Sequence, residues 1–209
     1  MIRFAPHAFA LAALAAVSFV APGPMHAQEA DETVIREMAL GEPDAPVTIV
    51  EYASLTCPHC ATFHDQVLPD LKREYIDTGK VRFVHREVYF DRYGLWASMV
   101  ARCGGEMRFF GILDRIYETQ SEWTASNDAV QVADNLRRIG LAAGLSEDQL
   151  NQCLNDRGKA EALVAWYERN AAEDDIDSTP SFIIDGEKYS NMPFAEFSDT
   201  LDALLPGDG

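Results

Sequence analysis

Two cysteines separated by two residues, Cys57 and Cys60, are the side chains whose spacing points most directly to chemistry. They follow a predicted strand and open a predicted helix, which is the context in which a Cys-x-x-Cys pair forms a dithiol/disulfide centre. The unpaired N–H groups and the positive dipole end of a first helical turn favour a thiolate at Cys57. The pattern therefore predicts thiol-disulfide exchange, with Cys57 and Cys60 as the catalytic pair.

The two residues between the cysteines fit this chemistry. Pro58 loses nothing in the first helical turn, where a backbone N–H has no partner, and His59 can act as a second cationic or hydrogen-bonding partner for the sulfur. If thiolate stabilisation favours the reduced form, a depression of the Cys57 pKa by about three units would shift the couple by roughly 4 kcal/mol. The disulfide would then be an oxidant.

A metal site and a purely structural bridge are the alternatives. Zinc requires four ligands, and the candidates are Cys57, Cys60, His59, His64 and His85. The sequence has neither a second close cysteine pair nor a His-x-x-x-His pattern, and haem attachment would require His where Ala61 stands. A bridge across so short a loop would stabilise the fold little. We therefore expect a redox pair without metal or other cofactor.

The elements around the cysteines alternate strand, helix and strand. A β-branched run over 47–52 predicts a central strand, in which Glu51 is the one charge. Apolar spacing predicts a helix over 57–77, and 81–88 reads as a second strand. So long a connection requires a parallel pair with a right-handed crossover. We expect the folded core to begin near Ala45.

A helical insertion is predicted after the second strand. The periodicity is helical over 93–172, in several pieces, and a strand then returns over 181–184. Asp185 and Gly186 predict a tight hairpin to a strand over 187–189, and 194–205 reads as a final amphipathic helix.

Within the insertion, Ser146 and Gln149 form the pattern of a capping box. Cys103 and Cys153 lie on separate helical pieces, 50 positions apart, and a structural disulfide is the simplest interpretation. Two free thiols, or a bridge that tunes the main couple, are the alternatives. The aromatic residues are predicted to form core: Trp96, Phe109, Phe110, Tyr117, Trp123 and Trp166.

Length and composition are those of a single exported domain carrying an insertion. The chain has 209 residues, 47% of them hydrophobic, and a net charge of -17, which argues against binding nucleic acid or anionic lipid. Arg3 precedes an apolar run over 8–21, which is too short for the ~20 residues that span a bilayer. Cleavage after Ala27 would leave 209 − 27 = 182 residues. An amphipathic or membrane-anchoring N-terminus is the alternative, and export would permit disulfides.

Three features of the sequence belong together: they are the segment Val47-Thr48-Ile49-Val50-Glu51-Tyr52-Ala53-Ser54-Leu55-Thr56-Cys57-Pro58-His59-Cys60, the helical insertion and Thr179-Pro180. Together they resemble the DsbA-type periplasmic thiol:disulfide oxidoreductases. The likeness covers roughly 45–205, and its most specific part is the dipeptide Pro58-His59, typical of the oxidase branch. It implies an α/β fold, a thioredoxin fold with an inserted all-helical domain. The expected boundaries are 1–27 for a signal peptide, 28–44 for an extension, 45–90 with 176–205 for the thioredoxin-fold domain, and 91–175 for the insertion.

The resemblance also implies a function. Such a protein acts in the periplasm as a monomer, donates the Cys57-Cys60 disulfide to reduced, unfolded exported proteins, and is reoxidised by a membrane partner that passes electrons to quinone. Glu51 matches the position of a buried acid beneath the active site. A carboxylate desolvated there has a raised pKa and can exchange a proton with Cys60. The alternative places Glu51 at the exposed end of its strand.

A further implication of the resemblance concerns substrate binding by Pro58, Thr179 and Pro180. In thioredoxin folds the proline corresponding to Pro180 is cis and faces the dithiol, which leaves the preceding backbone free to pair with an extended substrate. Thr179 departs from the strong oxidases, which usually carry Val there, whereas isomerases often carry Thr. We expect His64 to face solvent and to have no role.

Two other functions remain open. The same fold can act as an isomerase or reductase that is kept reduced, a reading that Thr179 motivates. The chain can instead be a redox-inert binding or chaperone protein whose cysteines only form structural disulfides. The thiolate pKa of Cys57 separates this last class from the first two.

Overall fold

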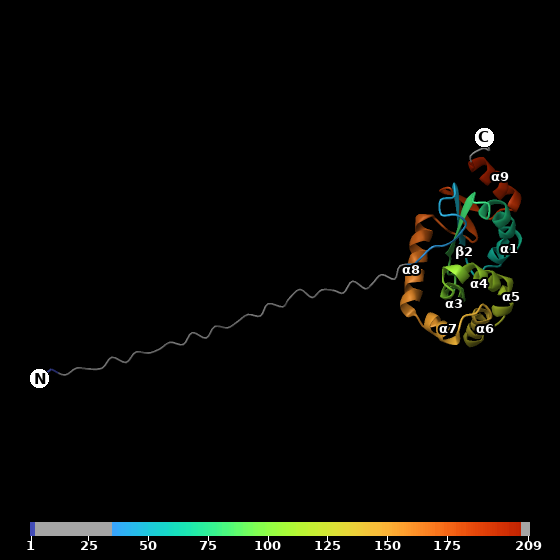
Figure 1. The fold of residues 1–209 in the computed structure, drawn as a ribbon. Helices are drawn as coiled ribbons and strands as arrows, with labels where there is room; N and C mark the ends of the chain where they lie inside the picture. Colours follow the sequence, from blue (N-terminus) through green and yellow to red (C-terminus); the bar gives the residue numbers. More distant parts are fainter. Residues whose placement is uncertain (3–34, 206–209) are drawn as a thin grey trace. The chain divides into compact units, whose positions relative to one another are not determined.

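The structure is a computed structural model that describes residues 1–2 and 35–205 (Figure 1). The predicted signal peptide lies, apart from its first two residues, outside the described residues. Across these two ranges, no helix combines the length and apolar character needed to cross a membrane.

A five-stranded mixed sheet forms the centre, in the order β1-β3-β2-β4-β5. The strands are β1 (Met38–Leu40), β2 (Val47–Ala53), β3 (Val81–Glu87), β4 (Ser181–Ile184) and β5 (Glu187–Ser190). Only β2 and β3 run parallel among these pairs, which confirms the predicted crossover pair. The predicted hairpin is also present, because Asp185 and Gly186 both adopt positive φ angles between β4 and β5.

The prediction that the folded core begins near Ala45 is wrong. Strand β1 pairs antiparallel with β3, with Met38 opposite His85, and the Met38 side chain is buried. Gly41 then turns the chain with φ +86°, and a Cβ there would collide with the Val81 carbonyl oxygen. A strand of three residues is too short to leave an alternating pattern, so its pairing is decided by the neighbouring strand.

The single helix expected over 57–77 is divided into three pieces. These are α1 (Pro58–Gln66), α2 (Leu68–Leu71) and a π-helical turn, η1 (Lys72–Ile76). The break falls at Val67, just before Pro69 in the first turn of α2. Because proline has no N–H to donate, the helix cannot continue its hydrogen-bond ladder through that position.

Six helices form the segment inserted between β3 and β4. They are α3 (Arg92–Cys103), α4 (Glu106–Glu118), α5 (Gln120–Trp123), α6 (Ala129–Ala142), α7 (Glu147–Leu154) and α8 (Arg157–Glu173). Figure 1 shows α3 to α7 gathered together. The capping box of Ser146 and Gln149 is confirmed at the start of α7.

Two hydrophobic clusters hold these parts together. One joins the sheet to α1 and to α9 (Phe194–Leu204), and its members include Phe63, Phe83, Phe182 and Phe197. The other fills the helical segment, with Phe109, Ile116, Trp123 and Leu136 among its members. Cys60 belongs to the second cluster, so α1 lies between the two. The sheet with its helical insertion is the predicted fold class; the exact domain boundaries stay a prediction.

Candidate active site

Cys57 lies at the N-cap of α1, the position where a side-chain atom can accept hydrogen bonds from the first free N–H groups of a helix. Its backbone is extended (φ -87°, ψ 119°), and Pro58 occupies the first helical position. The backbone N–H groups of His59 and Cys60 lower the pKa of this sulfur. The helix start therefore stabilises a negative charge on this atom.

The pKa of Cys57 is lowered from 9.0 to about 5. The largest cause is a hydrogen bond from the Cys60 side chain; burial acts in the opposite direction, and Thr179 and the helix N–H groups lower the pKa further. Both cysteines are free thiols in this structure. A thiolate at Cys57 is thus the main form at neutral pH.

Thr179 and Pro180 face the dithiol across the fold. Their peptide bond is cis, and the Cys57 thiol donates to the Thr179 carbonyl oxygen at 3.5 Å. The Thr179 Oγ1 atom is buried and has no hydrogen-bond partner among the described residues. A hydroxyl in that position can turn its hydrogen toward the sulfur when Cys57 ionises.

Cys60 has the opposite environment. Its side chain is fully buried, and burial raises the pKa of its thiol, as do the neighbouring Cys57 and Glu51 groups. The two sulfurs therefore differ in the way that exchange requires, because one ionises readily and the other holds its proton.

Glu51 lies buried in β2 between two histidines. The Glu51 Oε2 atom is 2.9 Å from Nε2 of His64 and 2.7 Å from Nδ1 of His85. His85 stands directly opposite Glu51 on β3, and His64 comes from α1. All three side chains are almost completely covered.

Two sequence predictions about this cluster are wrong. Burial does act to raise the pKa of Glu51, but the charges and hydrogen bonds of His64 and His85 overcome it and lower the pKa to about 2. His64 does not face solvent, because α1 packs between the sheet and α4. The carboxyl group is therefore ionised.

The same three residues present donor atoms within 4.8 Å of one another, a spacing at which a metal ion is conceivable. The carboxylate–imidazole distances of 2.9 and 2.7 Å are those of direct hydrogen bonds. Ligand atoms around a tetrahedral zinc with bonds of about 2.0 Å lie roughly 3.3 Å apart. The distances between these three side chains therefore match direct hydrogen bonds better than they match the coordination of a metal ion.

His59 is the predicted catalytic residue that the structure supports least. Its side chain is exposed, and its interaction with the Cys57 sulfur is made by the backbone N–H. A backbone donor at this helical position does not depend on the side chain. A catalytic role for the imidazole stays a prediction without a contact to support it.

Two residues of the insertion to which the sequence analysis gave no role in the active site contact it. Gln120 donates from Nε2 to the carbonyl oxygens of Leu55 (2.8 Å) and Cys57 (3.1 Å). Tyr117, expected only as core, stacks on His64 with 4.2 Å between ring centroids. Neither contact leaves a local sequence signal, because each joins segments more than fifty positions apart.

The other two cysteines form a disulfide. Cys103 at the end of α3 is bonded to Cys153 in α7, with 5.9 Å between their Cα atoms. Nearby, Arg102 forms a buried two-pronged pair with Glu87 at the end of β3, with both N–O distances 2.6 Å. These bonds tie the helical segment to itself and to the sheet.

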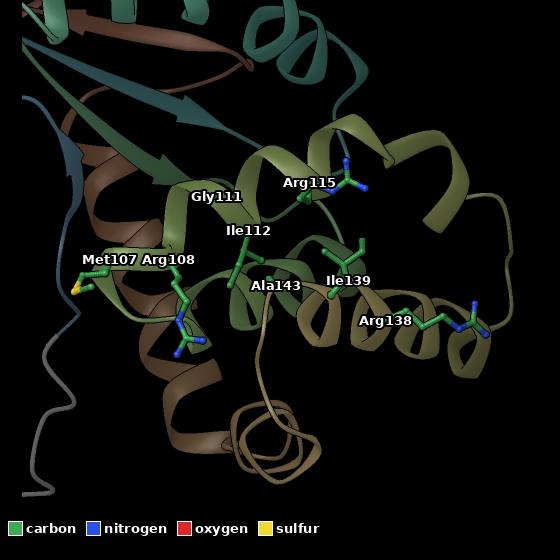
Figure 2. Close-up of a pocket in the computed structure, with 9 residues that line it drawn as sticks. Met107, Arg108, Gly111, Ile112, Arg115, Arg138, Ile139 and Ala143 are labelled. Atoms are coloured by element: carbon green, nitrogen blue, oxygen red, sulfur yellow. The ribbon is translucent and has the colours of Figure 1, made fainter.

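A hollow of about 520 Å³ lies between α4 and α6 (Figure 2). Its walls are formed by Met107, Arg108, Gly111, Ile112, Arg115, Arg138, Ile139, Ala142 and Ala143. The arginines are engaged by neighbouring polar groups, as in the bond from Arg108 Nη1 to the Gly144 carbonyl oxygen at 3.1 Å. None of these wall residues is Cys or His, so this hollow supplies no group for thiol chemistry.

Apolar surface is present close to the dithiol. Thr56 donates from Oγ1 to Asp91 Oδ2 at 2.8 Å, which brings the neighbouring Phe90 near the active-site loop. The Phe90 side chain is 60% exposed, and Pro58 is exposed as well. An exposed phenylalanine next to the residue that binds the active-site loop is the kind of surface that an unfolded chain can contact.

Comparison with known proteins agrees with this geometry. The family model described as Thioredoxin matches residues 33–203. A Rickettsia bellii protein named "Putative protein-disulfide oxidoreductase" is 35% identical over 170 residues, which cover 81% of this chain and 64% of that protein. The chain thus spans less than two thirds of that relative's length. Disulfide bond formation protein D of Bacillus subtilis is 24% identical, covering 80% and 77% of the two chains.

Among solved structures, alpha-DsbA1 of Wolbachia pipientis is similar with a TM-score of 0.75 and 29% sequence identity. The similarity covers 82% of this chain and 92% of that one. It includes both the sheet and the helical segment, because neither alone would reach that coverage.

Proposed function

Because the chain belongs to the DsbA-type thiol:disulfide oxidoreductases of the thioredoxin family, we propose that it is a dithiol oxidase that donates its Cys57-Cys60 disulfide to exported proteins. The observation that carries the proposal is the pKa of Cys57, lowered to about 5. A sulfur that is stable as an anion makes the reduced protein the favoured form and its disulfide an oxidant.

The reaction proceeds in two exchanges. A substrate thiolate attacks the Cys57 sulfur, the Cys57-Cys60 bond breaks, and Cys60 leaves and takes up a proton. A second substrate thiolate then attacks the substrate sulfur of the mixed disulfide, and Cys57 leaves as a thiolate. The substrate is oxidised by two electrons, and the Cys57-Cys60 pair is reduced by the same two.

The two thiols have unequal roles. Cys57 is partly exposed, so a protein substrate can reach its sulfur, whereas Cys60 is fully buried. When the mixed disulfide forms in the reverse direction, Cys60 resolves it from within. This division supports Cys57 as the residue that is attacked and Cys60 as the resolving residue.

Substrate binding is proposed at the cis peptide of Thr179 and Pro180. The Thr179 backbone lies 3.5 Å from the Cys57 sulfur, so an extended chain that pairs with it would place its own cysteine at the reacting atom. Phe90 and Pro58 offer apolar contact beside it. This surface is suited to unfolded chains, because it would bind the substrate through its backbone and its apolar side chains.

Location and partners follow as part of the proposal. The N-terminal segment reads as a secretory signal, which would bring the protein to the periplasm, where disulfides persist. Reduced unfolded proteins would be its substrates, and a membrane partner that passes electrons to quinone would reoxidise it. We propose that the protein acts as a monomer.

The test is oxidation of a reduced, unfolded protein by the purified, oxidised chain. We expect catalysed disulfide formation, and its loss in both Cys57→Ser and Cys60→Ala, because neither variant can form the Cys57-Cys60 disulfide. The matched control is a Cys103→Ser/Cys153→Ser double variant, which removes two sulfurs elsewhere and should still oxidise the substrate. Oxidation by Cys57→Ser at the parent rate would refute the proposal.

Thr179 is the residue that favours a second candidate function, that of a disulfide isomerase or reductase. A hydroxyl residue before the cis proline is common in isomerases, which work from the reduced state. The redox state of Cys57 and Cys60 in growing cells separates the two, since an oxidase is held as the disulfide and an isomerase or reductase as the dithiol. A redox-inert binding protein is disfavoured by the low pKa of Cys57, and slow alkylation of Cys57 after mild reduction would restore that alternative.

A further inference from the structure

We propose that His64 transfers the proton that Cys60 gains and loses, and that this proton exchanges with solvent through the cavity between α1 and α4. The inference rests on the proposed function, because it concerns the same dithiol. His64, to which the sequence analysis gave no role, thereby becomes part of a proton path, and His85 becomes a positioning residue.

The helix places His64 next to Cys60. The two residues are four positions apart in α1, so their side chains lie on the same face, one turn apart. Both are buried, Cys60 completely and His64 to 8% exposure. The face that carries the resolving sulfur therefore also carries an imidazole, the side chain that titrates closest to neutral pH.

Glu51 fixes which nitrogen of His64 is free. His64 Nε2 lies 2.9 Å from Glu51 Oε2 and 3.1 Å from Oε1, so this nitrogen is occupied by the carboxylate. The other nitrogen, Nδ1, is buried and has no hydrogen-bond partner within the described part of the chain. An unpartnered buried nitrogen is costly unless it has another purpose, such as exchange of a proton.

His85 holds the carboxylate from the opposite side. Its Nδ1 atom lies 2.7 Å from Glu51 Oε2, and its side chain is completely buried. It lines none of the cavities described for this structure. We assign His85 as a positioning residue, which keeps Glu51 ionised and directed at His64.

A cavity of about 640 Å³ leads from His64 to the surface between α1 and α4. It is lined by Ala61, Thr62, His64, Asp65, Gln66, Leu68, Pro69, Lys72, Asp114, Tyr117 and Glu118. His64 is buried, whereas Asp65, Asp114 and Glu118 are exposed. The cavity thus joins the free imidazole to carboxylates in contact with water, and these can deliver protons to it.

The ionisable groups around His64 and His85 are less suited to carry the proton than the imidazoles are. The titratable and charged groups facing the cluster come from α1, β3, α3 and α4: Cys60, His85, Glu87, Arg102, Asp114 and Tyr117. Burial raises the pKa of Cys60 and of Tyr117, so both hold their protons. Burial opposes ionisation of Glu87, but its pair with Arg102 lowers its pKa.

The proton balance is as follows. When the Cys57-Cys60 bond breaks, the electron pair leaves with the Cys60 sulfur, which takes a proton from His64 and becomes a thiol. His64 regains one proton from solvent through the cavity. On reoxidation Cys60 returns the proton to His64 before its thiolate closes the disulfide, and the two electrons leave with the oxidant. Without a proton donor, a thiolate buried at Cys60 would be a poor leaving group.

The test measures the reaction of the oxidised protein with reduced glutathione by stopped flow, from about pH 5 to about pH 9. His64→Gln keeps a hydrogen-bond donor for Glu51 but cannot titrate. We expect its rate to fall by roughly a hundredfold, which is the lower end of the range for general acid-base catalysis. Once each rate is divided by the thiolate fraction of glutathione, we expect its pH profile to flatten. The control Asp148→Asn changes an exposed charge on α7 that does not line this cavity, and it should keep the parent profile.

Imidazole rescue keeps the proposal testable if His64→Gln folds poorly. His64→Ala leaves space beside the cavity, and added imidazole should restore much of the rate. Pyrazole, of the same shape but far less basic, should not. Equal restoration by both compounds, or a parent-like pH profile in His64→Gln, would overturn the relay.

These outcomes are independent of the proposed oxidase function. Glutathione exchange occurs at Cys57-Cys60 whichever direction the protein works in the cell. Failure to oxidise unfolded proteins, together with His64-dependent glutathione exchange, would overturn the proposed function and support the relay. Oxidation of unfolded proteins by a fully active His64→Gln would do the reverse.

Discussion

The sulfur of Cys57 lies 3.5 Å from the carbonyl oxygen of Thr179, although the two residues are 122 positions apart. The cis peptide between Thr179 and Pro180 brings the Thr179 backbone and its hydroxyl to the start of α1. The reactive sulfur is therefore stabilised from two sides. The helix start provides N–H groups, and Thr179 provides a neutral group whose hydroxyl can turn toward the charge.

Thr179→Val should raise the pKa of Cys57. The variant keeps the shape of the side chain but removes the hydroxyl that lowers the pKa. Hydrogen bonds to charged groups contribute about 1.5–3 kcal/mol, so we expect a rise of roughly one to two units. The ultraviolet absorbance of the thiolate, followed against pH, measures it. Thr200→Val is the control, because that hydroxyl donates to the Glu196 carbonyl oxygen in α9, and an equal shift in both variants would contradict the assignment.

The stability of the reduced protein should depend on pH through Cys57. Its pKa is about 5 in the folded protein and 9.0 in its ordinary state. Between these values the unfolded chain binds one more proton at Cys57, so the free energy of unfolding rises with pH and the gain is lost as the pH falls through about 5. Urea unfolding of the parent and of Cys57→Ser isolates this effect. A difference between them that stays constant across the range would be inconsistent with a low pKa.

Much of this site follows from sequence because its parts are local. Cys57, Pro58 and Cys60 share one helical turn, and the position of that turn after a strand was sufficient to predict an ionised sulfur. The parallel pairing of β2 and β3 followed from the length of their connection. Local patterns of this kind need no knowledge of the tertiary fold.

The histidine cluster was beyond that kind of reasoning. Glu51, His64 and His85 come from β2, α1 and β3, and their contacts exist only when the helix packs on the sheet. One signal was present, since a buried Cys60 implies that His64, four positions later, lies on the same buried face. The lowered pKa of Glu51 could not be predicted, because burial alone raises it and the two histidines reverse the sign.

The buried pair of Arg102 and Glu87 should be essential for stability. Arg102 binds both carboxylate oxygens at 2.6 Å, and Ser98 donates to the same carboxylate at 2.9 Å. Arg102→Met would leave a buried charge unpaired, which costs about 3–5 kcal/mol in free energy of unfolding. The control is Arg115→Met, which breaks an exposed pair with Glu118 and should cost less than about 1 kcal/mol. Urea denaturation compares them, and equal losses would rule out a special role for the buried pair.

Removal of the Cys103-Cys153 disulfide should destabilise the fold and leave the redox site unchanged. The bond closes a loop of 50 positions between α3 and α7, and the chain-entropy model gives about 4 kcal/mol for a loop of that length. In Cys103→Ser/Cys153→Ser, we therefore expect the free energy of unfolding to fall by about 2–4 kcal/mol in urea. Because neither sulfur is among the groups that set the pKa of Cys57, the thiolate titration should match the parent. A shift of that titration would instead show that the second disulfide tunes the first.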